Sequence, residues 1–133
     1  MKLGFTGTEK GMSLEQLWKF YYAVEYLMPD EMHHGDCIGA DSDAAHICFL
    51  LKVKTISHPP IDDKARAFTL SNIVLPPKGY LIRNREIVDS CDMLIATPKE
   101  MREQKRSGTW ATIRYAKQIN RIILIIFPNG SLL

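Results

Sequence analysis

The sequence lacks any apolar run long enough to cross a membrane. Its longest apolar stretch, 122–127, has the length of a strand, whereas a bilayer-spanning helix needs about 20 apolar residues. The N-terminus has no apolar signal core and enters predicted structure at once. We therefore expect a cytoplasmic protein that has no membrane partner.

Cysteine is scarce, with Cys37, Cys48 and Cys91 widely spaced along the chain. An odd number argues against a disulfide framework, and no C-x-x-C pair is present for zinc or redox chemistry. The other metal-binding signals are weak too, because His33, His34 and His46 lack zinc-site spacing and an accompanying carboxylate set. We expect no metal and no cofactor, and no Ser-His-Asp or Cys-His arrangement is indicated.

Net charge is also small. The formal charge of +2 is too low to argue for nucleic acid or an anionic surface as a partner by itself. Binding of single-stranded nucleic acid stays an alternative rather than the favoured hypothesis. It would rest on the charged loop 99–106, which is of mixed sign.

What the sequence does contain is an alternation of strand-like and helix-like segments over 133 residues, a length that fits a single domain, 1–133. This alternation predicts an α/β protein: a three-layer Rossmann-like fold with a mostly parallel sheet of about five strands. The strands are expected at 2–6, 31–34, 53–57, 92–96 and 121–127. The helices are expected at 14–28, from Asp41 or Ser42 to 51, at 80–90 and at 107–118.

The first helix carries the clearest start signal, since Ser13 followed by Gln16 predicts a capping box. Its apolar residues recur at helical spacing and predict one face used for the core or for a dimer contact; they are Leu14, Leu17, Trp18, Tyr21, Val24 and Met28. We therefore expect a homo-oligomer, with a dimer favoured. In the helix 80–90, the residues expected to face inward are Leu81, Ile82, Ile87 and Val88. The polar segment 62–77 is either a loop over the site or a plain connection.

Glycine and hydroxyl residues follow the first strand at Thr6-Gly7-Thr8. This composition is common in phosphate cradles, because glycine lets backbone N–H groups approach a ligand closely. It is weak alone, since the full G-x-G-x-x-G pattern is missing. A tight strand-to-helix turn is an equally good interpretation.

The stretch Arg106-Ser107-Gly108-Thr109 is a stronger candidate. It places glycine and two hydroxyls at a predicted helix start, where the helix dipole and free N–H groups favour an anion. No acidic residue follows in the first turn, and Arg106 adds a formal charge. We expect phosphate to bind here if it binds anywhere.

The stretch 35–41 carries negative rather than positive charge. It places Gly35, Asp36, Gly39, Ala40 and Asp41 at a predicted strand-to-helix junction. Carboxylates repel phosphate but accept hydrogen bonds from hydroxyls or base N–H groups. We therefore predict ribose or base near Asp36–Asp41 and phosphate near Ser107–Thr109. The alternative is that Asp41 only caps a helix.

Arg83 and Asn84 lie on a predicted helix. Arg83 either clamps a phosphate or carboxylate or belongs to a solvated face, paired with Glu86 and Asp89.

Three of these motifs together resemble the SLOG superfamily, whose members include Lonely Guy phosphoribohydrolases, the DNA-processing protein A (Smf) family and YspA-like small proteins. Residues 35–46 resemble the Smf segment Gly-(Ile/Ala)-Asp followed by Ala-Ala-His. Residues 83–87 resemble its Arg-Asn-Arg-x-Ile, and residues 106–112 resemble its Ser-Gly-(Ser/Thr) helix start. The resemblance covers most of the chain and implies a single SLOG-like Rossmannoid domain that binds a small nucleotide-like ligand.

The comparison with Lonely Guy proteins also shows a departure. Arg83 stands nine residues before Asp92, as in that family, and residues 91–98 resemble its strand ending in proline. The family continues at once with Gly-Gly-x-Gly-Thr and a catalytic Glu three residues later. Here the loop 99–106 intervenes, and Thr112 holds the position of that Glu.

The leading hypothesis is therefore binding of a nucleotide or nucleotide-derived ligand, as a sensor or a ligand-sequestering domain. An N-glycosidic hydrolase acting on nucleoside monophosphates, with Arg83 and Asp41 as its catalytic candidates, is the alternative that the resemblance implies. A DNA-processing type of protein that binds single-stranded DNA is a second alternative. A pure assembly module, in which the glycine junctions are only turns, is a third.

Overall fold

Short apolar runs form a six-stranded, all-parallel sheet in the computed structural model, which describes residues 1–133 throughout. The strands are β1 (Lys2–Gly7), β2 (Glu31–His34), β3 (Lys54–Ser57), β4 (Ile73–Val74), β5 (Met93–Thr97) and β6 (Ile122–Ile125). Their order across the sheet is β4-β3-β2-β1-β5-β6. The predicted α/β fold with a parallel sheet is confirmed.

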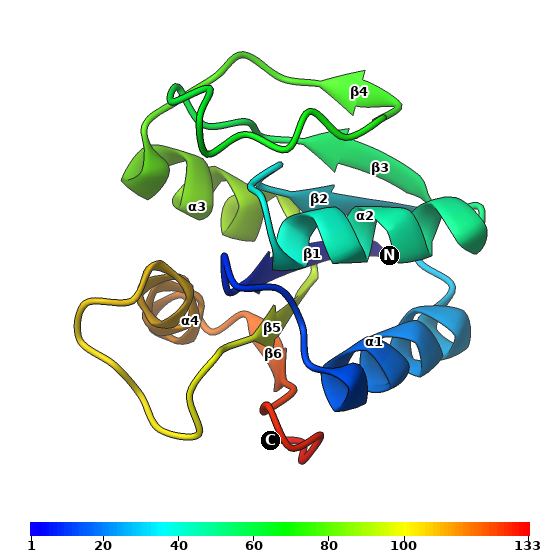
Figure 1. Ribbon diagram of the computed structural model, residues 1–133, viewed down its shortest axis with the longest axis vertical. Helices are drawn as coiled ribbons and strands as arrows, with labels where there is room; N and C mark the ends of the chain where they lie inside the picture. Colours follow the sequence, from blue (N-terminus) through cyan, green and yellow to red (C-terminus); the bar gives the residue numbers. More distant parts are fainter.

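Four helices cover the two faces of this sheet: α1 (Leu14–Leu27), α2 (Ala40–Leu50), α3 (Tyr80–Ser90) and α4 (Gly108–Gln118). Figure 1 shows α1 and α2 on one face and α3 and α4 on the other. Because side chains alternate along a strand, Leu3 and Phe5 of β1 pack under α1 and α2, and Leu94 of β5 packs under α3 and α4. None of the four helices has the length and apolar character needed to span a bilayer.

The predicted capping box at the start of α1 is confirmed. The Ser13 hydroxyl accepts from the Gln16 backbone N–H at 3.1 Å, and the Gln16 side-chain oxygen Oε1 accepts from the Ser13 backbone N–H at 2.9 Å. Gln16 is buried, and its amide also donates to the carbonyls of Pro98 and Ile126, at 2.8 and 2.9 Å. This side chain therefore ties α1 to the segments that follow β5 and β6.

The rotation of α1 differs from the sequence expectation. Gln16, Phe20 and Val24 face the core, whereas Leu14, Trp18 and Met28 are exposed. The core interpretation of those three residues was wrong, whereas Leu17, Tyr21 and Val24 of the predicted face do pack on the core. Trp18 stacks on Tyr22 at the surface, with ring centroids 5.9 Å apart. A dimer contact through this face stays a prediction.

Helix α3 is rotated in the same sense relative to its prediction. Ile87 and Val88 are buried as expected, but Leu81 and Ile82 are more than half exposed. Arg83 takes the inward position instead, with an exposed fraction of 5%. Of the two interpretations of Arg83, the solvated face was therefore wrong, since the guanidinium finds acceptors inside the protein.

The N-cap of helix α2 lies two residues before Asp41 and three before Ser42, the two predicted caps. Gly39 is its N-cap and makes no side-chain bond, so the assignment of Asp41 or Ser42 as the cap was wrong. Gly39 adopts φ 106° and ψ −128°, a conformation that only glycine reaches readily. A Cβ there would lie 2.3 Å from the carbonyl oxygen of Glu9. The close approach of the loops after β1 and β2 therefore fixes the start of α2.

The segment 62–77 contains β4, a strand of two residues that the sequence did not reveal and that brings the sheet to six strands. Ile73 and Val74 pair in parallel with Ile56 and Ser57 of β3. The remainder of the segment packs on the β2–α2 loop, where the N–H of Ile38 donates to the carbonyl of Ala65 at 2.9 Å. The segment is thus a packed edge of the sheet.

The close contact at Gly39 gives a direct test of the fold. Gly39→Ala should lower the free energy of unfolding by about 3 kcal/mol, because the new methyl group meets backbone in a strained conformation. Gly79→Ala is the matched control: Gly79 has φ −61° and nothing within 4 Å of a Cβ. That variant should stay within about 0.5 kcal/mol of the parent in urea unfolding. Equal effects of the two substitutions would contradict this backbone geometry.

Candidate functional site

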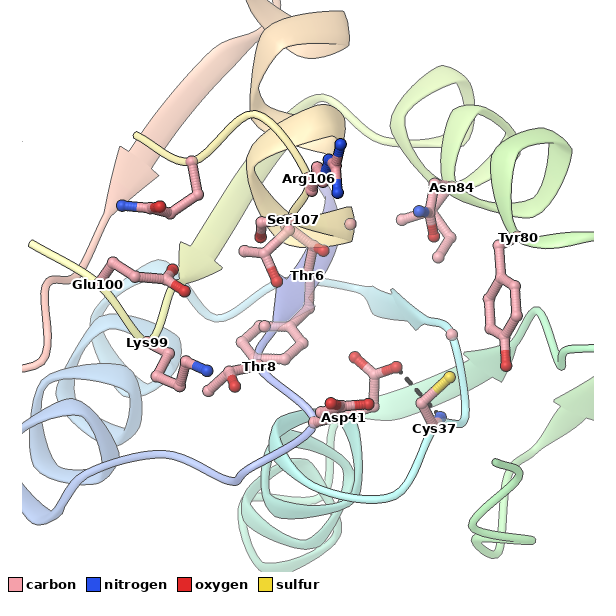
Figure 2. Close-up of a pocket in the computed structure, with 18 of the residues that line it drawn as sticks. Thr6, Thr8, Cys37, Asp41, Tyr80, Asn84, Lys99, Glu100, Arg106 and Ser107 are labelled. Atoms are coloured by element: carbon pink, nitrogen blue, oxygen red, sulfur yellow. Dashed lines mark hydrogen bonds between the residues drawn. The ribbon is translucent and has the colours of Figure 1, made fainter. Parts of the chain in front are cut away.

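The strand order reverses at β1, which has β2 on one side and β5 on the other. Ligands of open α/β sheets bind outside the carboxyl ends of the strands at such a switch point. A cavity of about 840 Å³ lies there, in the upper part of the range for small-molecule sites. Its walls come from the ends of β1 and β2, from α3, and from the loop between β5 and α4 (Figure 2).

Most of the residues singled out from the sequence lie together in the lining of this cavity. They are Thr6, Gly7, Thr8, Gly35, Asp41, Arg83, Asn84, Arg106, Ser107, Gly108 and Thr109. Segments separated by as much as a hundred residues of sequence therefore meet at one place. Figure 2 shows Asp41 and Cys37 on one side of the cavity and Ser107 and Arg106 on the opposite side.

Asp36, Gly39 and Ala40, also predicted as ligand residues, do not line the cavity. The carboxylate of Asp36 is buried and accepts from the Thr69 N–H and hydroxyl, at 3.0 and 2.7 Å. It also accepts from Arg66 Nε at 3.2 Å. Asp36 therefore anchors the segment 62–77.

The start of α4 presents free donors to the cavity. Ser107 is the N-cap, and its hydroxyl accepts from the Trp110 N–H at 3.2 Å. The N–H groups of Gly108 and Thr109 precede the first intrahelical bond and have no acceptor in the protein. No acidic residue lies in the first turn. The helix dipole and these donors together favour an anion.

Two hydroxyls next to this helix start also lack a partner. Thr6 at the end of β1 and Thr109 in the first turn of α4 are each about nine-tenths buried and line the cavity, and neither hydroxyl bonds to the protein. Thr8 differs, because its hydroxyl accepts from the Lys10 N–H at 3.1 Å. Neither oxygen is sealed from solvent, so both hydroxyls are free to bond to water or to the acceptor atoms of a ligand.

Arg83 reaches from α3 to the ends of two strands. Its Nη1 donates to the carbonyl of Gly35 at 2.5 Å and to that of His58 at 3.3 Å. Its Nε donates to the Asn84 side-chain oxygen at 2.8 Å, and both terminal nitrogens contact Cys37 Sγ. The protein itself therefore uses most of the donors of Arg83. Because the side-chain oxygen of Asn84 accepts from Arg83, its amide nitrogen is the atom turned to the cavity (Figure 2).

Asp41 is the one buried carboxylate of the lining, with an exposed fraction of 7%. Its Oδ2 accepts from the Cys37 N–H at 3.1 Å, as the dashed line in Figure 2 marks. Burial raises the pKa of Asp41 from 3.8 to about 6, and the nearby guanidinium of Arg83 opposes this rise. Near neutral pH the group is mostly ionised and accepts hydrogen bonds from hydroxyl or N–H donors.

A chain of side chains behind the cavity holds α3 against the sheet; we term it the histidine chain. His33 Nε2 lies 2.5 Å from Glu31 Oε2, and His33 Nδ1 lies 2.8 Å from His58 Nε2. His58 Nδ1 in turn lies 2.8 Å from Glu86 Oε1 on α3, and Glu86 also pairs with Lys78. Burial lowers the pKa of His58, whereas its hydrogen bond with Glu86 acts in the opposite direction.

Sequence reasoning missed several lining residues. Cys37 and Tyr80 are among them, together with Glu9, Ile38 and much of the loop 99–106. The only signal for that loop was its position directly before a helix start with anion-binding character. Tyr80 stands at the edge of the cavity beside Cys37 (Figure 2), with 49% of its surface exposed.

Thr112, at the position of the Lonely Guy glutamate, faces away from the cavity. Its hydroxyl donates to the Gly108 carbonyl at 2.9 Å within α4, and the side chain is buried. The carboxylates that do line the cavity are Glu9, Asp41, Glu100 and Glu103. None of them occupies the place in α4 that the resemblance assigns to the catalytic group.

Comparison with known proteins adds information on the fold. No protein-family profile matches the chain, and no curated protein matches it significantly. The molybdenum cofactor binding protein of the phototrophic bacterium Rippkaea orientalis has a TM-score of 0.75 and 16% identity, over 95% of this chain and 76% of that one. The structural-genomics target TM1055 has a TM-score of 0.67 and 9% identity, over 92% and 71%. Both show a shared fold.

The raised pKa of Asp41 makes a prediction about stability. Because the folded-state value of about 6 exceeds the unfolded value of 3.8, the stability of the parent falls as pH rises from about 4 to 6. Asp41→Asn mimics the neutral acid and should be more stable than the parent above pH 6, by up to about 3 kcal/mol. The gain should vanish near pH 4.

Urea unfolding at pH 4, 6 and 8 measures this difference. Asp63→Asn is the matched control, since Asp63 is exposed and should show no such pH-dependent gain. A less stable Asp41→Asn variant at pH 8 would contradict the prediction, because the ionised Asp41 beside Arg83 would then be net favourable.

Proposed function

We propose that this protein binds a phosphate-bearing nucleotide or nucleotide-derived ligand in the cavity at the switch point, as a sensor or ligand-sequestering domain. The observation that carries the proposal is the presence of several free hydrogen-bond donors in one part of the cavity. The free N–H groups of Gly108 and Thr109 meet the unpartnered hydroxyls of Thr6 and Thr109 there. A phosphate has enough acceptor oxygens to satisfy all of them at once.

The opposite side of the cavity suits the rest of such a ligand. The carboxylate of Asp41 accepts hydrogen bonds from ribose hydroxyls or from base N–H groups. The exposed ring of Tyr80 offers a flat apolar face for a heterocycle. The amide nitrogen of Asn84, between them and the phosphate end, is a donor for a ring or sugar oxygen. The proposed ligand therefore lies with its phosphate at α4 and its base toward α2 and α3.

One structural neighbour and the motif resemblance support binding of a small ligand. The neighbour from Rippkaea orientalis is described as a molybdenum cofactor binding protein, and the organic part of that cofactor is a phosphorylated heterocycle. The motif resemblance at residues 35–46, 83–87 and 106–112 supports placement in the SLOG superfamily. Both lines support a small nucleotide-like ligand.

Calorimetric titration with AMP, with adenosine as the ligand control, tests the proposal. AMP should bind at least tenfold more tightly than adenosine, because only AMP brings the phosphate. Thr109→Val keeps the shape of the side chain and should weaken AMP binding about tenfold through loss of one hydrogen bond to a charged group. Thr112→Val is the matched protein control, since its hydroxyl bonds within α4, and should leave AMP affinity unchanged.

Two results would contradict the proposal: equal affinity for AMP and adenosine, or equal effects of Thr109→Val and Thr112→Val. The alternatives from the sequence have their own readouts with the same protein. An N-glycosidase would release ribose 5-phosphate from AMP during the titration. A single-stranded DNA binder would retard an oligonucleotide in a salt-dependent way. Mass spectrometry of the protein as isolated would identify any ligand that co-purifies with it.

A further inference from the structure

The loop 99–106 forms the wall of the cavity beside the start of α4. It lies between β5 and α4. In the Lonely Guy pattern that residues 91–98 resemble, the glycine motif follows the strand directly, without such a loop. Nearly all of its side chains line the cavity, namely Lys99, Glu100, Glu103, Gln104, Lys105 and Arg106. The loop therefore adds charged groups to a helix start that already attracts anions.

The acidic side chains of this loop are held by α4. The indole N–H of Trp110 donates to Glu100 Oε1 at 3.0 Å, and Arg114 Nη1 donates to Glu103 Oε2 at 2.9 Å. Arg114 also donates to the carbonyls of Gln104 and Lys105, at 3.2 and 3.3 Å. Two side chains of one helix thus fix the loop in place and neutralise one of its carboxylates.

The cationic side chains of the loop have no such partner. Lys99, Lys105 and Arg106, the loop cations that line the cavity, make no ion pair, whereas Arg66 and Lys78 outside the cavity are both paired with carboxylates. In Figure 2, the ammonium group of Lys99 points into the cavity toward Thr8, and the guanidinium of Arg106 stands above Ser107. The free cations therefore flank the start of α4.

Positive charge is concentrated on the loop side of the cavity. Three unpaired cations there face Glu100 as the one loop carboxylate without a cationic partner, and the helix start adds about half a positive charge. The other unpaired lining carboxylates, Glu9 and Asp41, come from outside this loop. A phosphomonoester carries about −1.5 to −2 near neutral pH. A second phosphate group brings further negative charge and further acceptor oxygens for lysine and arginine.

We propose that the loop 99–106 is a second anion subsite, so that the cavity takes a diphosphate-bearing ligand, such as a nucleoside diphosphate or its ester, in preference to a monophosphate. This inference rests on the proposed function, because the first phosphate is the one at α4. The second phosphate lies on the loop side of the first and binds the loop cations Lys99, Lys105 and Arg106. Trp110 and Arg114 act as positioning residues that keep the loop in place.

The test compares ADP with AMP by calorimetry at one fixed, low ionic strength. ADP should bind at least tenfold more tightly than AMP to the parent protein. Replacing Lys99, Lys105 and Arg106 together by Gln should lower this ratio to between one and two. The three side chains are exposed and unpaired, so the variant should keep the parent's melting temperature.

The matched control replaces three exposed lysines outside the cavity, Lys19, Lys52 and Lys117, by Gln. It has the same net charge as the loop variant and should keep the full preference for ADP. Arg114→Gln should also reduce the preference for ADP, although Arg114 does not line the cavity. Glu103 and the loop carbonyls lose their donor in this variant, so the loop is held less firmly.

The outcomes separate the two proposals. Binding of AMP over adenosine with no preference for ADP would overturn the second subsite and leave the proposed function intact. A preference for ADP that survives in the loop variant would also overturn it. Failure of both AMP and ADP to bind more tightly than adenosine would overturn the proposed function, and this inference with it.

Discussion

The buried guanidinium of Arg83 is the interaction on which the cavity depends. A charge with only 5% of its surface exposed is costly to bury unless it is fully hydrogen-bonded. Arg83 meets this condition by taking the carbonyls of Gly35 and His58, at the ends of β2 and β3, and the side chain of Asn84. These bonds fix α3 to two strand ends and set the width of the cavity. They also require glycine at position 35, where a Cβ would lie 2.5 Å from Arg83 Nη1.

This constraint assigns different tasks to the charged groups of the cavity. Since Nε and Nη1 of Arg83 are already bonded within the protein, the guanidinium shapes the site and lowers the cost of ionising Asp41. Arg83 would have to break its hydrogen bonds with the Gly35 and His58 carbonyls to bind a ligand through Nη1, so it is poorly suited to that role. Loss of a ligand on substitution of Arg83 would report collapse of the wall as much as loss of a contact. Thr109 and the loop cations are better probes of binding, because they support no other part of the fold.

The sequence predicted the α/β fold, the capping box at Ser13 and the segments that meet at the cavity, because strand–helix alternation and glycine turns are local signals. It missed β4, since a strand of two residues has no periodicity. Hydrophobicity alone predicted that Leu81 and Ile82 face inward. It does not take into account that the guanidinium of Arg83 bonds to two strand-end carbonyls. The histidine chain was equally invisible, as His33 and His58 belong to different strand ends and share a contact only once β2 and β3 are paired.

The two helices that start at the cavity differ in the charge of their first turns, and this difference bears on how the proposed ligand would lie. The first turn of α2 contains Asp41 and Asp43, whereas the first turn of α4 contains no acidic residue. Asp43 is already bonded to the Met12 N–H at 2.9 Å, so Asp41 is the carboxylate that faces a ligand. A phosphate placed against ionised Asp41 would meet a like charge, which costs about 4 kcal/mol for two unit charges 4 Å apart at an effective dielectric constant of about 20. Electrostatics therefore disfavours the reversed pose, which supports the proposed orientation with the phosphate toward α4.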